Sequence, residues 1–248
     1  MSKLNELATL IREAKCCHVF TGAGVSTLSG IRDFRGKDGV YAKPWEGHRV
    51  EEILSLPFFR KKPELFYAWA KEFCYRLEAF DANIVHRTLA KMQKNSLIAD
   101  IYTQNIDLLH QKAGSPRVYE IHGSPSSHHC SKCKKIFYYD EIAPKVMRDE
   151  LPRCDECSAV IKPDIILYGE SLDAKMLEQA FNAMADCDLL LVLGSSLTVQ
   201  PAASMPLVAY QNGAKVVIVN AQPTPIDFVA TILLQDLDEC FTFLDKEF

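Results

Sequence analysis

The chain has 248 residues, of which 48% are hydrophobic, and its formal net charge is −4. A chain of this length can bury a large core, and one domain with an elaboration fits it better than two equal domains. Positive and negative residues are interspersed, so no basic stretch is long enough to grip a nucleic-acid backbone. Nucleic acid is therefore not an expected partner.

Residues 1–15 have an amphipathic pattern, with Leu4, Leu7, Leu10 and Ile11 on one face of a predicted helix. Because charges occur throughout this segment, it does not resemble a signal peptide. No apolar run approaches the length of a membrane span, and nine cysteines without a secretory signal argue against a disulfide scaffold. We therefore expect a cytoplasmic protein with no membrane partner.

Short apolar runs alternate with helical patterns along the chain. Strands are predicted at 16–21, 98–103, 118–121, 188–193 and 216–220, with a further candidate at 240–243. Helices are predicted at 63–80, 83–94, 173–186 and 202–212, with a further candidate at 226–233. Strands that alternate with helices predict an α/β fold, with a mostly parallel sheet covered by helices on both faces.

Two segments interrupt this alternation. Residues 37–81 have a helical pattern and many aromatic residues, which we interpret as packing between helices. Residues 124–163 contain paired cysteines. Both segments are therefore expected to lie outside the sheet.

Four cysteines in the second interruption have the spacing of a metal site. A CxxC pair at Cys130 and Cys133 is followed, after twenty residues, by a second pair at Cys154 and Cys157. Two such pairs match a four-thiolate zinc site, with four unligated buried cysteines as the alternative. Because four thiolates close a tetrahedral shell, the zinc is expected to be structural and not catalytic.

A glycine-rich turn follows the first predicted strand. Gly22 and Gly24 begin a dinucleotide-binding fingerprint, but Thr27 stands where its third glycine would be. A strand that breaks into such a turn before a helix can hold a phosphate on backbone N–H groups. A tight turn without a ligand explains the same residues equally well.

Polar residues follow other predicted strands. Gln104, Asn105 and Asp107 stand at the carboxyl end of one strand, where α/β sheets bind ligands, although capping of the next helix is also a common role for Asn and Asp. His122 ends another strand and is a candidate general base, because its ordinary pKa lies near neutrality. A structural role for this histidine is the alternative.

Gly194, Ser195 and Ser196 close the strand at 188–193, and Asn220 closes the one at 216–220. Small hydroxyl residues and an amide at successive strand ends suit contacts with ribose and phosphate. Turns also favour these residue types.

The succession of these motifs resembles the sirtuin family. The chain contains, in order, GAGVS…SGI-x-DFRG, TQNID-x-LH, E-x-HG, CxxC…CxxC, KPDIILYGE, GSSL-x-V-x-P and VIVN. The resemblance extends from Thr21 to Asn220, and the motifs in this one order make it specific. It implies an NAD-dependent protein-lysine deacetylase that yields nicotinamide, O-acetyl-ADP-ribose and free lysine.

The resemblance also implies the domain organisation. A Rossmann-like NAD-binding domain would comprise residues 1–36, 82–123 and 164–248. A smaller domain would combine a helical module at 37–81 with the four-cysteine zinc module at 124–163. We expect NAD as co-substrate, one structural zinc ion and a monomer.

The family pattern implies which residues contact NAD. Phe34 would shield the reacting ribose, Arg35 would lie near the phosphates, and His122 and Asn105 would be the catalytic residues. The full set is Gly22, Ala23, Gly24, Thr27, Asp33, Phe34, Arg35, Gln104, Asn105, Ile106, Asp107, His122, Gly194, Ser195, Ser196, Asn220, Leu237 and Asp238.

The acetylated protein or peptide would bind as an extended strand. By resemblance, residues 164–169 form the strand that pairs with it, a form of β-augmentation. The substrate-binding residues implied are Ile166, Leu167, Tyr168, Gly169 and Val199.

Two features bear on cofactor affinity and acyl specificity. Arg32 stands where the family motif has proline, so we expect a more mobile cofactor loop and weaker NAD binding. The family members that remove acidic acyl groups carry a Tyr-x-x-Arg pair. The third residue after Tyr67 is Ala70 and not arginine, and Arg76 follows Tyr75 directly, so neither tyrosine provides such a pair. Acetyl or longer aliphatic groups are therefore expected over succinyl.

Other classes of function remain open at this point. A nucleic-acid-binding zinc-ribbon protein would contain the same cysteines, but the acidic net charge argues against it. An NAD-binding regulator without turnover, or an ADP-ribosyltransferase, would share the cofactor motifs. The presence of Asn105, Asp107 and His122 together favours the deacetylase.

Overall fold

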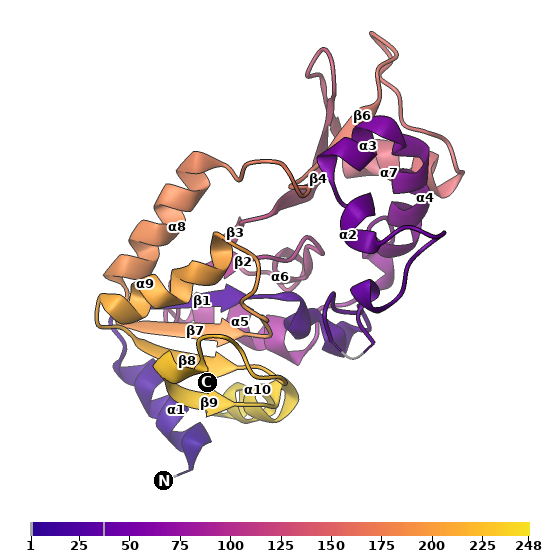
Figure 1. Ribbon diagram of the computed structural model, residues 1–248. Coiled ribbons are helices and arrows are strands. Elements are labelled where there is room, and N and C mark those ends of the chain that lie inside the picture. The colour runs from indigo at the N-terminus through magenta and orange to yellow at the C-terminus, as the bar shows by residue number, and fades with distance from the viewer. Residues whose placement is uncertain (1, 37) are drawn as a thin grey trace. The chain divides into compact units, whose positions relative to one another are not determined.

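The computed structural model describes residues 2–36 and 38–248, and the chain divides into two compact units (Figure 1). The large unit comprises Met1–Asp33, Phe80–Ile121 and Asp173–Phe248. The small unit comprises Phe34–Ala79 and His122–Leu172. Within the described residues, no helix is both long enough and apolar enough to cross a membrane.

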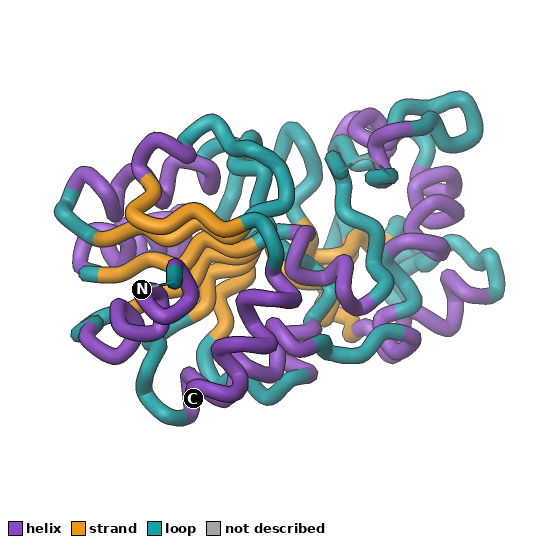
Figure 2. The backbone as a smooth tube through the Cα atoms, turned by 90° about the horizontal axis from the view of Figure 1, so that it is seen from below, coloured by secondary structure: helices purple, strands orange, loops and turns teal. Residues whose placement is uncertain are grey.

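The large unit is built on a parallel sheet, seen from a second side in Figure 2. Its strand order is β3-β2-β1-β7-β8-β9, with every neighbouring pair parallel. The strands are β1 (Cys17–Thr21), β2 (Ile101–Thr103), β3 (Val118–Glu120), β7 (Leu189–Leu193), β8 (Lys215–Val219) and β9 (Ala230–Leu234). The order reverses direction between β1 and β7, which is where doubly wound sheets bind ligands.

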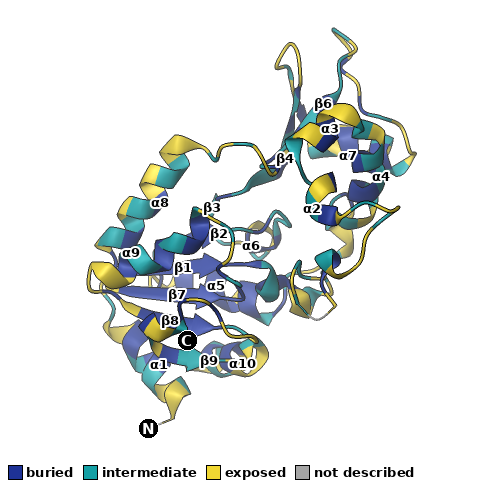
Figure 3. Cartoon of the chain, in the orientation of Figure 1, coloured by how far each residue is buried: buried dark blue, intermediate teal, exposed yellow. Residues whose placement is uncertain are grey.

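Helices cover both faces of this sheet, as the sequence predicts. On one face lie α1 (Lys3–Glu13), α5 (Ile84–Lys94) and α10 (Leu237–Glu247), packed against alternate strand residues such as Val19 and Leu191. On the other lie α8 (Ala174–Asp186) and α9 (Met205–Gln211). The central strands are buried throughout (Figure 3), which explains their nearly continuous apolar sequences.

Shorter helical segments complete the large unit. α6 (Leu109–Lys112) follows β2. One 3-10 turn follows β1, one precedes α9 and one precedes β9. These turns are η1 (Ala23–Ser29), η4 (Ala202–Ser204) and η5 (Asp227–Val229). The helix predicted at 202–212 is thus a 3-10 turn that continues into α9.

Two predictions near the C-terminus are wrong. The candidate helix at 226–233 is the short turn η5 followed by strand β9, which pairs with β8 and extends the sheet. The candidate strand at 240–243 lies inside α10. The Asp236 side chain caps this helix by accepting from the Glu239 N–H, and Cys240, Phe241 and Leu244 bury one helical face in the core. Tertiary packing therefore overrides the local β-propensity.

The small unit contains a helical part and a second sheet. The helices are α2 (Val50–Ile53), α3 (Leu56–Lys61) and α4 (Pro63–Phe73), with 3-10 turns η2 (Val40–Ala42) and η3 (Leu77–Ala79). The predicted helix at 63–80 ends at Phe73, where Cys74 caps it through a backbone bond to Ala70. The rings of Phe59, Phe66 and Tyr67 meet edge to face, which confirms the predicted packing of the aromatic residues.

The second sheet is antiparallel, in the order β5-β4-β6. It consists of β4 (Gly123–Cys130), β5 (Ile136–Tyr138) and β6 (Ile161–Ile165), and α7 (Tyr139–Met147) follows β5. Strands β4 and β5 were not predicted, because glycine, proline and the cysteine turns interrupt the alternation of apolar and polar residues in this segment. Of the predicted strand at 164–169, only its first two residues belong to β6.

Candidate active site and metal centre

The turns after β1 and β7 touch through their backbones. The Gly24 N–H donates to the Gly194 carbonyl at 2.8 Å, and the Gly22 N–H donates to the Leu193 carbonyl at 3.0 Å. A Cβ on Gly194 would lie 2.5 Å from the Val25 nitrogen, and one on Gly24 would lie 2.8 Å from the Gly194 Cα. These glycines are therefore required for contact between the two turns at the switch point of the sheet.

Polar groups after β2 join this contact. The Asn105 side-chain amide donates to the Gly22 carbonyl and to the Ser26 hydroxyl, both at 3.1 Å. The Ser26 hydroxyl in turn donates to Asp107 Oδ2 at 2.5 Å. Gly22, Asn105 and Asp107, which the sequence analysis placed in one site, thus lie together.

Asp107 caps the next helix, which is one of the two roles that the sequence left open, and it also accepts from Ser26. Its Oδ1 accepts from the Leu109 N–H at 2.9 Å, as a cap for α6, while Oδ2 faces Ser26. Burial raises the pKa of Asp107, and the hydrogen bonds from Ser26 and Leu109 oppose that rise. The N-cap residue of α6 is Leu108 and not Asn105, whose side-chain nitrogen donates to Gly22 and Ser26.

The strand ends β2 and β7 are also linked. Gln104 Nε2 donates to the buried Ser195 hydroxyl at 3.4 Å, and the Leu197 N–H donates to the same hydroxyl. Ser196 pairs with the Thr198 hydroxyl at 3.1 Å. Asn220 donates to the Gln222 carbonyl at 2.7 Å, which is the turn interaction that the sequence left open.

The remaining predicted site residues of the large unit comprise cofactor residues and Val199, which was predicted to bind substrate. Thr27 is exposed and donates to the Gly24 carbonyl at 2.9 Å. Ile106 follows Asn105 and is half-buried, as is Val199 in the loop after β7. Leu237 and Asp238 form the first turn of α10. Ala23 opens η1, and Asp33 is the last residue of the unit's first segment.

The other predicted residues belong to the small unit. Its second segment begins at His122, whose carbonyl accepts from the Ile166 N–H at 2.8 Å. Gly123 has φ +75°, and a Cβ there would lie 2.0 Å from the Asp164 carbonyl oxygen. The E-x-HG motif therefore needs its glycine so that the backbone after His122 can lie against β6.

Residues beyond β6 leave the strand ladder. Ile166 and Leu167 have no strand pairing, and Tyr168 forms an isolated bridge with Ser55. Gly169 has φ +91° in the turn that follows. Phe34 and Arg35 lie in the loop before η2, where the rings of Phe34 and Tyr41 are 5.2 Å apart.

Further buried polar residues of this region lie outside the predicted set of site residues. The Thr21 hydroxyl donates to the Thr103 hydroxyl at 2.8 Å and lies 3.1 Å from His110 Nε2. The Thr103 hydroxyl accepts from the Asn105 N–H at 3.0 Å. Threonines at the ends of two otherwise apolar strands were the available signal. Ser26 is a further buried hydroxyl of this region that the predicted set of site residues does not include.

This donor set fits NAD. Carboxamides, hydroxyls and one carboxylate converge from the carboxyl ends of β1, β2 and β7, at the switch point where such sheets hold dinucleotides. Amide and carboxylate groups can bind the nicotinamide carboxamide, and hydroxyls and amides can bind ribose. Gln104, Asn105, Asp107, Ser195 and Ser196 are the residues that would hold it.

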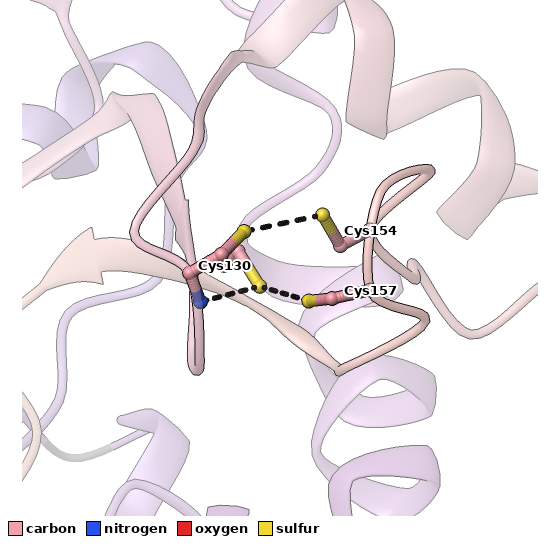
Figure 4. Close-up of side chains that lie close together, drawn as sticks. Cys130, Cys154 and Cys157 are labelled. Atoms are coloured by element: carbon pink, nitrogen blue, oxygen red, sulfur yellow. Dashed lines mark hydrogen bonds between the residues drawn. The ribbon is translucent and has the colours of Figure 1, made fainter.

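The four cysteines form one cluster in the small unit (Figure 4). Their sulfur atoms lie within 4.8 Å of one another, with Cys130 and Cys157 sulfurs 3.3 Å apart and Cys133 and Cys154 sulfurs 3.6 Å apart. Tetrahedral zinc with Zn–S bonds of about 2.3 Å would separate the sulfurs by roughly 3.8 Å. The cluster therefore fits a structural zinc ion, and the Cys133 N–H directed at the Cys130 sulfur suits a thiolate ligand.

Comparison with known proteins agrees with this site. The NAD-dependent protein deacetylase of Thermotoga maritima is 40% identical over 230 residues, which are 93% of this chain and 92% of that protein. NAD-dependent protein deacylase 2 of Archaeoglobus fulgidus is 38% identical over 226 residues, 91% of this chain and 87% of that protein.

Solved structures are similar over nearly the whole chain. A structure of Sir2 with deacetylated p53 peptide and 3'-O-acetyl ADP-ribose has a TM-score of 0.93 at 38% identity, covering 99% of this chain and 98% of that one. A Sir2 structure with p53 peptide and NAD+ has a TM-score of 0.88 at 37% identity, covering 99% and 97%. Residues 22–201 match the family model described as Sir2 family. The chain therefore belongs to the Sir2 family.

Proposed function

We propose that this protein removes acetyl groups from lysine side chains of proteins and uses NAD as co-substrate. The products are nicotinamide, O-acetyl-ADP-ribose and free lysine. The observation that carries the proposal is the linked set of Ser26, Asn105 and Asp107 at the switch point of a Sir2-family sheet. Relatives named NAD-dependent protein deacetylase support the same reaction.

The residues have distinct proposed roles. Asn105 and Asp107 receive the nicotinamide carboxamide, and Gln104 contacts the attached ribose. The acyl oxygen of the substrate attacks C1′ of this ribose, and nicotinamide leaves. His122 accepts the proton of the ribose hydroxyl that then attacks the acyl carbon, as a histidine imidazole acting as a general base can do. Water completes the release of lysine.

We further propose how the two units divide the work. The large unit binds NAD, and the small unit combines a helical module with a zinc module whose ion is structural. The acetylated peptide pairs with the backbone at Ile166 and Leu167, which lie outside the β6 ladder. The protein acts as a cytoplasmic monomer, and neither nucleic acid nor membrane is a partner.

The acyl preference follows from two tyrosines. The Tyr67 hydroxyl donates to the Ile161 carbonyl at 2.6 Å, and the Tyr75 hydroxyl is bonded to His128 at 2.7 Å. Both side chains are buried, so neither hydroxyl is available for an acyl carboxylate. We expect acetyl-lysine peptides to be better substrates than succinyl-lysine peptides, which paired kinetics on one peptide sequence will measure.

The test is nicotinamide release from NAD. Wild-type protein should release nicotinamide only when an acetyl-lysine peptide is present, and His122→Ala should lower kcat by at least about 100-fold, the usual contribution of a general base. His129→Ala is a matched control. His129 lies at the other end of β4 from His122, is half-exposed, and is bonded to Asp164 of β6.

Two outcomes would contradict the proposal. Release without peptide would indicate glycohydrolase or ADP-ribosyl transfer chemistry. Equal activity of His122→Ala and His129→Ala would remove His122 from the mechanism.

A further inference from the structure

Tyr168 is held at a fixed position by its backbone. Its N–H donates to the Leu54 carbonyl at 2.8 Å, and its carbonyl accepts from the Leu56 N–H at 2.9 Å. The following turn is fixed as well, since Glu170 accepts from the Leu167 N–H at 2.9 Å and pairs with Lys162 at 2.8 Å. The Tyr168 side chain therefore extends from a rigid support.

The hydroxyl of this side chain contacts the cofactor loop. Arg35 Nη2 donates to Tyr168 Oη at 3.1 Å, and Tyr41 Oη lies 3.2 Å from the same oxygen. The Arg35 guanidinium also lies over the Tyr41 ring, 5.0 Å from its centroid. One hydroxyl and one aromatic face thus define the position and the plane of the guanidinium.

Tyr41 is itself part of a closed loop. Its N–H donates to the Phe34 carbonyl at 3.0 Å, and its ring packs beside that of Phe34. A Cβ on Gly39 would lie 2.6 Å from the Phe34 oxygen, so glycine is needed for this closure. Phe34, Gly39 and Tyr41 are therefore in close contact, and the Tyr168 hydroxyl joins Arg35 to the turn after β6.

A guanidinium carries five N–H donors in one plane. The bond to Tyr168 uses one donor, and stacking on Tyr41 uses the face of the group and none of its edges. An arginine fixed in this way can still donate to an anion. Because its side chain is already ordered, binding loses less conformational entropy.

We propose that the Tyr168 hydroxyl is a positioning group that holds Arg35 ready for the phosphates of NAD. This inference rests on the proposed function, which gives Arg35 that ligand. It assigns the Tyr168 side chain a role in cofactor affinity, separate from the pairing of its neighbouring backbone with the peptide. The contacts at Leu54 and Leu56 are made by the backbone and do not depend on the hydroxyl.

The experiment removes only that hydroxyl. Tyr168→Phe keeps the ring and every backbone bond, and Tyr210→Phe removes a half-exposed hydroxyl on α9 as the matched control. The dissociation constant of NAD is measured by calorimetry, and KM and kcat are measured with an acetyl-lysine peptide. We expect Tyr168→Phe to weaken NAD binding three- to tenfold and to raise the KM for NAD equally, whereas Tyr210→Phe should leave both constants within twofold of wild type.

A double-mutant cycle identifies the partner of the hydroxyl. If Tyr168 acts through Arg35, Tyr168→Phe should change the NAD dissociation constant less than 1.5-fold when Arg35 is already alanine. An equal loss in both backgrounds, or unchanged NAD binding in Tyr168→Phe, would overturn the inference. Wild-type protein that binds NAD but releases no nicotinamide would instead contradict the proposed function, and the calorimetric comparison would still test Tyr168.

Discussion

The candidate NAD site and the cysteine cluster are built in opposite ways. In the large unit, glycines and polar side chains meet because the strands beneath them are packed in a continuous apolar core. In the small unit, the cysteines come from two turns beside a sheet whose edge strand β5 exposes Ile136 and Tyr138. The first arrangement is maintained by packing, and the second needs a ligand ion to hold its loops together.

The two regions should therefore be vulnerable to different changes. The NAD site should depend on backbone shape and tolerate loss of zinc. The zinc module should depend on its thiolates and tolerate changes in the sheet of the large unit.

Removal of zinc should have the largest effect. Structural zinc contributes apparent binding free energies of about 10 kcal/mol or more, so a strong chelator, or Cys154→Ser, should unfold the zinc module. Hydrogen exchange should become fast in residues 123–165 and stay slow in β1 and β7. Equal loss of protection in both units would show that the core of the large unit also depends on the metal.

Gly194→Ala should damage the large unit in turn. Gly194 has φ +58°, and its added Cβ would lie 2.5 Å from the Val25 nitrogen, so we expect a loss of about 2–5 kcal/mol of unfolding free energy. Gly213 has φ +91° with nothing within 4 Å, so Gly213→Ala should cost about 1 kcal/mol. Similar urea midpoints for the two variants would contradict the close contact between the turns.

Acid should destabilise both units through buried histidines. Burial lowers the pKa of His86 to about 4 and that of His128 to about 4. Burial also lowers the pKa of His110 well below its ordinary value, with the neighbouring His86 adding to the effect. The unfolded chain takes up these protons below about pH 6.5, whereas the folded chain does not. Their stabilisation is therefore complete above that pH and is lost as pH falls from about 6.5 toward 4.

Each such histidine should contribute a slope of about 1.4 kcal/mol per pH unit within this window. Urea unfolding at pH 7, 6 and 5 measures the slope for the wild type. His86→Leu should be less stable at pH 7, yet its stability should fall less steeply with acid. An unchanged slope in this variant would show that His86 is already protonated in the folded protein.

The sequence predicted the repetitive parts of the fold well. The apolar runs at 188–193 and 216–220 are confirmed as β7 and β8, because strands buried on both faces require apolar residues at every position. The C-terminal elements could not be predicted, because the choice between helix and strand for Phe241 was made by the core it packs into. Short runs without a clear period do not contain that information.

The candidate site shows the same division. Spacing alone predicted the four cysteines that the structure brings together, since ligand geometry restricts their separation. The order of motifs predicted Asn105 and Asp107 as site residues, and both are linked through Ser26. No pattern predicted that Ser26 would join them or that the Tyr168 hydroxyl would hold Arg35, because these contacts join segments far apart in the chain.

Arg32→Pro should give the smallest effect. Arg32 stands next to the boundary of the large unit, in a stretch without helix or strand. If proline fits the local backbone, it should stabilise the loop by about 0.4–1 kcal/mol and tighten NAD binding by two- to fivefold. Calorimetry with NAD measures this change, and weaker or equal binding would mean that neighbouring residues already fix the loop.

The register of the central strands has a consequence for synthesis on the ribosome. β1 pairs with β7, with Cys17 opposite Leu189, so the middle of the sheet cannot form until β7 has been synthesised. Both segments of the small unit end by Leu172 and are therefore translated before β7 emerges. We expect nascent chains halted soon after Leu172 has left the exit tunnel to bind zinc while β1 still lacks protection, so that the inserted unit matures ahead of the domain that encloses it in sequence.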